Sequence, residues 1–119
     1  METKTYQGGC HCGAVRYEAT SDLAQVMTCN CSMCHRMGWT LSFVDEDKFK
    51  LLSGQESLTD YQFNKKKIHH VFCKVCGVRS FCYGTDDAGK SAYGINVRCL
   101  DDVDLTTLGT PMAYDGKNL

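Results

Sequence analysis

The sequence is poor in the features that mark several classes of protein. It has one proline, Pro111, and no low-complexity stretch, so nothing indicates a linker, and its 119 residues suit a single domain over residues 1–119. No run approaches the roughly 18 apolar residues that a membrane span needs, so we expect no membrane contact. The 13 basic residues nearly balance the 14 acidic ones, which argues against a nucleic-acid partner.

The N-terminal segment, METKTYQGGC, is polar and lacks the apolar stretch of a secretory signal. We therefore expect a cytoplasmic protein, and disulfides rarely persist in the reducing cytoplasm. The chain nevertheless has nine cysteines, an odd number that excludes a fully paired disulfide framework within one chain. Metal binding is the better interpretation of so many thiols.

The sequence pattern predicts a mainly β protein built from many short strands. Residues 41–49 hold a short strand and a turn, and alternating or β-branched segments typical of strands occupy residues 13–20, 57–64, 68–73, 78–84 and 91–100. Gly94 interrupts the last of these and indicates a bulge. Helical turns are expected only near residues 31–37 and 101–105, and Asp115-Gly116 indicates a turn in the tail.

Two cysteine pairs have the spacing of a structural zinc site. Cys10 and Cys12 are two residues apart, so in an extended chain both thiols point to one side. Cys73 and Cys76 flank two residues and precede Gly77, which suits a knuckle turn that needs a positive φ. Two such pairs are what a zinc ion with four cysteine ligands requires.

A third cluster places Cys29, Cys31 and Cys34 within six residues. Cys34 comes where a helix is expected to begin, and backbone N–H groups there favour the thiolate. Three protein ligands leave one zinc position for water or substrate, which is the general mark of a catalytic site. Spacing alone does not decide the pairing, since Cys10 and Cys12 could join this cluster instead.

Other residues near the third cluster have more than one interpretation. His35 is a fourth ligand, a proton shuttle or a bystander, and Arg36 is a candidate site residue beside the metal loop. Trp39 either walls a pocket or fills the core. The isolated Cys82 and Cys99 are expected to be small buried hydrophobic residues.

Four ordered motifs closely resemble the glutathione-dependent formaldehyde-activating enzyme family, to which the centromere protein V domain is related. They are GGCHCGAVRY, CNCSMCHRMG, FCKVCGVRSF and INVRCLDD, and the tail YDGKNL is similar to the usual ending of the family. The resemblance implies a β-tent of short antiparallel strands, stabilised by two Zn²⁺ ions. It implies a structural zinc at Cys10, Cys12, Cys73 and Cys76, and an open, catalytic zinc at Cys29, Cys31 and Cys34.

The resemblance also implies a carbon–sulfur lyase that joins a small thiol such as glutathione to a small aldehyde, giving S-hydroxymethylglutathione from formaldehyde. The zinc would lower the pKa of the bound thiol or polarise the aldehyde. Three thiolates plus a substrate thiolate weaken the acidity of the ion, so nearby donors such as Asn30 or Arg36 would have to stabilise the site. The alternative is a non-catalytic zinc module that binds a protein or nucleic-acid partner.

Glutathione carries two carboxylates that need cationic partners. The candidates are Arg36, the run Lys65–Lys67, Arg79 and Arg98. Arg98 could instead form a structural ion pair with Asp101 or Asp102.

The ligand count predicts two zinc ions per chain, of which the one with three protein ligands is lost more readily to a chelator. Elemental analysis of the purified protein gives the number of zinc ions per chain. Repeating the analysis after mild chelation shows whether one of the two ions is lost more readily. A single, tightly held zinc ion would contradict the two-site prediction.

Overall fold

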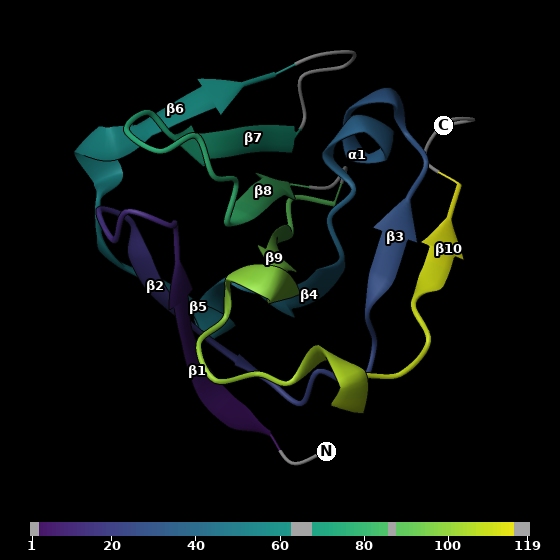
Figure 1. The fold of residues 1–119 in the computed structure, drawn as a ribbon. Coiled ribbons are helices and arrows are strands. Elements are labelled where there is room, and N and C mark those ends of the chain that lie inside the picture. The colour runs from purple at the N-terminus through teal and green to yellow at the C-terminus, as the bar shows by residue number, and fades with distance from the viewer. Residues whose placement is uncertain (1–2, 63–67, 86–87, 116–119) are drawn as a thin grey trace.

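Figure 1 shows a computed structural model of the chain, which describes residues 3–62, 68–85 and 88–115. The described residues form ten strands, one short α-helix and four 3-10 turns. None of these helices is long and apolar enough to cross a membrane. The strands are β1 (Lys4–Gly9), β2 (Arg16–Ser21), β3 (Met27–Cys29), β4 (Leu41–Asp45), β5 (Phe49–Ser53), β6 (Leu58–Tyr61), β7 (Ile68–Cys73), β8 (Phe81–Thr85), β9 (Ser91–Asn96) and β10 (Met112–Tyr114). The helix is α1 (Ser32–Met37), and the 3-10 turns are η1 (Glu46–Lys48), η2 (Gln55–Ser57), η3 (Val97–Cys99) and η4 (Leu105–Thr107).

The strands form two sheets. The smaller sheet has the order β1-β2-β5, and the larger has the order β10-β3-β4-β9-β8-β7-β6. All pairings are antiparallel except that of β10 with β3, in which the C-terminal segment runs alongside β3 in the same direction. This pairing carries the end of β10 towards α1, beside the third cysteine cluster (Figure 1).

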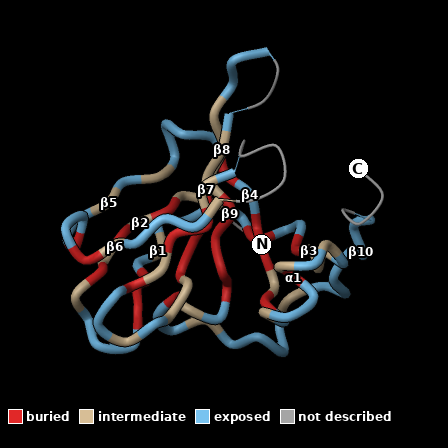
Figure 2. The backbone as a smooth tube through the Cα atoms, turned by 90° about the horizontal axis from the view of Figure 1, so that it is seen from above, coloured by how far each residue is buried: buried red, intermediate tan, exposed pale blue. Residues whose placement is uncertain are grey.

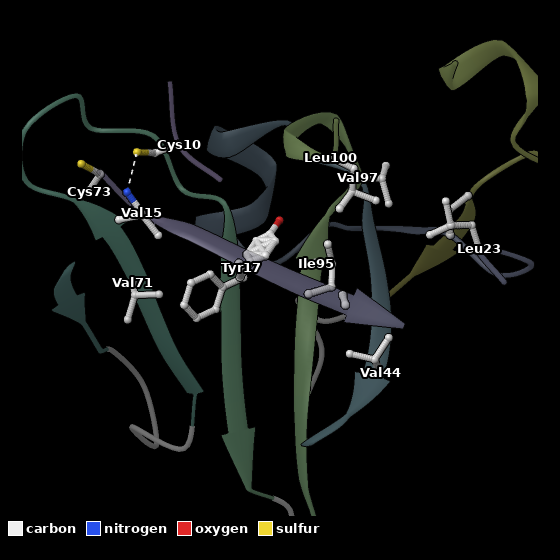
Figure 3. Close-up of a cluster of buried hydrophobic side chains, with 13 residues drawn as sticks. Cys10, Val15, Tyr17, Leu23, Val44, Val71, Cys73, Ile95, Val97 and Leu100 are labelled. Carbon is white, nitrogen blue, oxygen red and sulfur yellow. Dashed lines mark hydrogen bonds between the residues drawn. The ribbon is translucent and has the colours of Figure 1, made fainter. Parts of the chain in front are cut away.

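The hydrophobic core lies between the two sheets. Alternation along β2 buries Tyr17 and Ala19. The Tyr17 ring meets Phe81 edge-on at a centroid distance of 5.5 Å, and its hydroxyl donates to the carbonyl of Ser80 at 3.0 Å. The buried hydroxyl is thereby satisfied. Figure 3 shows Tyr17 from the small sheet lying against Ile95 from the large one, and in Figure 2 the buried stretches run through the middle of the molecule.

The mainly β, single-domain architecture expected from the sequence is confirmed, and α1 lies within the expected 31–37 helical segment. Of the second expected helical segment, 101–105, residues 101–102 form a turn and only Leu105 is helical, as the first residue of η4. The strands β1, β3 and β10 were not expected from the sequence pattern. Of the expected Asp115-Gly116 turn, Gly116 lies outside the described residues.

The bulge expected at Gly94 is wrong. Gly94 pairs in regular register with Phe43 of β4 and with Cys82 of β8. A Cβ at this position would lie 2.8 Å from Cys82 Sγ and 3.0 Å from Phe43 Cε1. Glycine is therefore needed so that these two side chains can pack over the strand, which is the other reason for glycine in a strand interior.

Replacing Gly94 by alanine should lower the free energy of unfolding by about 1–3 kcal/mol, because the added methyl group overpacks the contact with Cys82 and Phe43. Gly109→Ala is the matched control, since a Cβ there meets no atom within 4 Å. We expect it to change stability by less than about 0.5 kcal/mol. Urea denaturation of both variants measures the difference, and equal midpoints would contradict the packing argument.

Candidate metal centres

Seven of the nine cysteines gather into two groups, and within each group all sulfur atoms lie within 4.8 Å of one another. All nine cysteines are free thiols. Each group could hold a metal ion. The first group is Cys10, Cys12, Cys73 and Cys76, and the second is Cys29, Cys31 and Cys34.

The four-cysteine group has the dimensions of a tetrahedral zinc site. Cys12 Sγ lies 3.6 Å from Cys10 Sγ and 3.7 Å from Cys73 Sγ. Zinc–sulfur bonds of about 2.3 Å in a tetrahedron place neighbouring sulfur atoms about 3.8 Å apart. The sulfur atoms therefore already stand close to the separation that the ion requires.

Two similar turns carry these cysteines. The backbone N–H of Cys10 donates to the carbonyl of Val15, and that of Cys73 donates to the carbonyl of Val78, each at 3.1 Å. Each turn contains a glycine in the left-handed region, as at Gly77 with φ 80°. The first turn joins β1 to β2 in the small sheet and the second follows β7 in the large sheet, so the group connects the two sheets (Figure 3).

The electrostatics of this group favour a bound cation. The backbone at Val78 donates to Cys76 and lowers its pKa to about 6. At Cys12 the backbone at Ala14 favours the thiolate, but desolvation and the three neighbouring thiols outweigh it and raise the pKa to about 11. Four thiolates cannot accumulate so close together without a compensating positive charge, which a divalent metal supplies.

The three-cysteine group is built by the turn from β3 into α1. The backbone N–H of Cys31 donates to Cys29 Sγ at 3.5 Å, and that of Cys34 donates to Cys31 Sγ at 3.3 Å. Burial alone would raise the pKa of Cys31, but the donor at Cys34 and the neighbouring thiols lower it overall. The pKa of the cysteine at the helix N-cap is therefore shifted towards the thiolate form.

A pocket of about 420 Å³ adjoins this group, and Cys29 and Cys34 lie in its wall. The opposite wall comes from the end of the chain, because the backbone N–H of Asn30 donates to the carbonyl of Tyr114 at 3.2 Å and Asn30 Nδ2 donates to Asp115 at 3.0 Å. This part of the pocket wall was not predicted from the sequence. The only indication of it was the C-terminal motif YDGKNL, which resembles the usual ending of the family. The lining residues are Thr28, Cys29, Asn30, Cys34, His35, Gly38, Trp39, Ala113, Tyr114 and Asp115.

The residues that follow the metal loop divide between the pocket and the surface. His35 is exposed and lines the pocket, but it does not belong to either group of candidate ligands. Arg36 is also exposed; its Nη1 donates to the carbonyl of Ser32 at 3.1 Å, and it is not among the described residues that line the pocket. Trp39 combines both expected roles, since it is 3% exposed, packs in a buried cluster and lines the pocket.

The candidate partners for substrate carboxylates are dispersed. Arg79 donates to the carbonyl of His70 at 3.2 Å and covers the ring of Phe72, and the run Lys65–Lys67 lies outside the described residues. Arg98 lines a different pocket. Of the two acidic residues offered as alternative ion-pair partners for Arg98, Asp101 pairs with Arg16 instead.

The two isolated cysteines differ in burial. Cys82 is 5% exposed, and burial raises its pKa to about 12, so the expected small buried residue is confirmed there. Cys99 is only partly buried, which makes its expected full burial wrong, and its sulfur lies 4.0 Å from the carbonyl of Arg79.

Comparison with known proteins identifies relatives over nearly the whole chain. The sequence profile of the family described as "Glutathione-dependent formaldehyde-activating enzyme" matches residues 5–113, a range that includes both cysteine groups. The fold is also similar to the crystal structure of a Rhodobacter sphaeroides protein solved as a structural genomics target. That match has a TM-score of 0.80 and 32% sequence identity, and it covers 91% of this chain and 99% of the other.

Replacing Cys73 by alanine should lower the free energy of unfolding by more than about 4 kcal/mol, because it removes one ligand of the group that connects the sheets. Cys99→Ala is the matched control outside both groups, with an expected loss of about 1 kcal/mol. Denaturation in zinc-containing buffer, repeated with a strong chelator, measures both effects. We expect the chelator to destabilise the parent protein but hardly to change Cys73→Ala, and equal stability of the two variants would contradict the structural assignment.

Proposed function

Because the chain belongs to the glutathione-dependent formaldehyde-activating enzyme family, we propose that it is a zinc-dependent carbon–sulfur lyase that joins a small thiol, such as glutathione, to a small aldehyde, such as formaldehyde. The observation that carries the proposal is the convergence of Cys29, Cys31 and Cys34 beside a pocket of about 420 Å³. A structural zinc site with four protein ligands binds no further ligand and therefore needs no adjoining pocket.

The two cysteine groups take different roles in this proposal. Cys10, Cys12, Cys73 and Cys76 supply four thiolates and leave no position free, as a structural zinc requires. The three-cysteine group would hold a zinc ion with one protein ligand fewer, and a thiol entering from the pocket would supply the fourth ligand. A zinc ion held there supplies a Lewis-acid centre that favours the deprotonated thiol.

The reaction needs a place for one proton. Forming the carbon–sulfur bond moves the thiol proton, in the net balance, to the aldehyde oxygen, which becomes the hydroxyl group of the product. His35 is exposed and lines the pocket, and an imidazole can both accept and donate a proton near neutral pH. We assign His35 as the proton shuttle rather than as a metal ligand.

The described part of the pocket suits the thiol end of a substrate better than its carboxylates. Its described lining has no lysine or arginine and includes the carboxylate of Asp115. Two carboxylates of glutathione would therefore extend to the rim of the pocket and into solvent. Because three unoxidised thiols are needed, we also propose a reducing compartment such as the cytoplasm for this activity.

The proposed activity is tested by following the formaldehyde-dependent loss of free glutathione thiol with zinc-loaded protein. We expect the protein to accelerate the reaction, and we expect Cys31→Ala to return the rate to the spontaneous value while the zinc content falls from two ions to one. Cys99→Ala, which changes a thiol outside both groups, should retain the activity and both ions. No acceleration by the parent protein with two bound zinc ions would contradict the glutathione–formaldehyde reaction and favour a non-catalytic zinc module.

A further inference from the structure

The sulfur atoms of the three-cysteine group differ in the hydrogen-bond donors that they receive. Cys29 Sγ accepts from the backbone N–H of Cys31 and Cys31 Sγ from that of Cys34. Both donors are fixed by the turn into α1. For Cys34 the described residues supply no backbone donor, although its side chain is 7% exposed and water has little access to it.

Trp39 places a side-chain N–H beside that third sulfur. The residue is 3% exposed and packs in one buried cluster with Cys34, Leu41 and Cys82. Its Nε1 is buried and makes no full hydrogen bond to any described residue. A buried N–H without an acceptor is energetically unfavourable, so this N–H is expected to have an acceptor when the site is complete.

The Cys34 sulfur is the group on which this N–H acts. The indole N–H of Trp39 faces this sulfur within the buried cluster that the two residues share. A neutral thiol is a weak acceptor, whereas a thiolate accepts a strong, charge-assisted hydrogen bond. A metal ion that holds Cys34 as a thiolate should therefore tighten the contact.

We propose that the indole N–H of Trp39 donates to the sulfur of Cys34 once the three cysteines bind their metal ion, so that each sulfur of the group receives one N–H donor. Trp39 then acts as a positioning residue, because it orients and tunes a ligand without touching the substrate's reacting atoms. The inference rests on the metal site of the proposed function, but not on which thiol or aldehyde reacts there.

The hydrogen bond from Trp39 would offset part of the negative charge of the proposed metal site. Three cysteine thiolates and one substrate thiolate give a divalent ion a formal charge of -2, which reduces its acidity. Hydrogen bonds to ligand sulfur withdraw electron density from it and leave the ion more acidic. The donors expected from the sequence are engaged elsewhere, since Asn30 holds Asp115 and Arg36 donates to Ser32.

A direct test uses the fact that Trp39 is the only tryptophan of the chain. Protein labelled with nitrogen-15 gives one indole N–H signal, and cadmium-113 replaces zinc at thiolate sites as a spin-active ion. We expect the second equivalent of cadmium to move the indole proton signal downfield and to produce a scalar coupling between that proton and cadmium through the N–H···S contact. A signal that neither shifts nor couples with two ions bound overturns the inference.

A variant test separates the donor from its packing. Trp39→Phe keeps an aromatic ring and removes the N–H, and Leu41→Val trims the same buried cluster without changing any donor. In the cobalt-substituted protein we expect Trp39→Phe to move the sulfur-to-cobalt charge-transfer band of the second ion to lower energy. We also expect it to weaken that ion's binding about 10-fold. Leu41→Val should leave both quantities unchanged.

The outcomes distinguish this inference from the proposed function. If the parent protein binds two ions and Trp39→Phe matches it, or if Leu41→Val reproduces the change seen in Trp39→Phe, the donor role of Trp39 is wrong while the metal site stands. If the parent protein takes up only one ion, the proposed catalytic site is wrong, and the inferred hydrogen bond is wrong with it.

Discussion

The convergence of four thiols from two turns is the interaction on which the rest of the structure depends. Cys10 and Cys12 come from the small sheet, whereas Cys73 and Cys76 come from the end of a strand in the large one. A chain of 119 residues can build only a modest core. A metal ion held by all four sulfurs would fix the angle between the sheets at the edge of that core, where Cys10, Cys73 and Val15 lie together (Figure 3).

The second group shows what the fold does with one ligand fewer. Its three sulfurs come from a single turn, so they bring no distant segments together and contribute less to the connection between the sheets. One side of this group adjoins a pocket. The C-terminal segment forms another part of the pocket wall, held there by the contacts of Asn30 with Tyr114 and Asp115. The two groups thus differ in the number of cysteines and in what lies beside them, while both offer only sulfur ligands.

The features of the fold that could be predicted from the sequence alone are the local ones. Cysteine spacing, alternating strands and the helical turn after Cys31 depend on neighbours within a few residues, and these features were predictable. The parallel pairing of β10 with β3, the pocket wall at Tyr114 and the Arg16–Asp101 ion pair join residues 84 or 85 positions apart in the sequence. Gly94 was noticed, but only the side chains crossing over it from two neighbouring strands decide between a bulge and a close contact.

The placement of Trp39 links the two constraints that the three-cysteine group must satisfy. A pocket wall needs a large rigid side chain, and a cluster of thiolates needs N–H donors in a region that excludes water. The backbone can serve Cys29 and Cys31 because the turn into α1 directs its N–H groups back towards them. Cys34 lies one turn further, beyond the reach of those donors, and a buried indole meets both needs at once. An aromatic residue without an N–H would preserve the wall and leave the most buried of the three sulfurs without a donor.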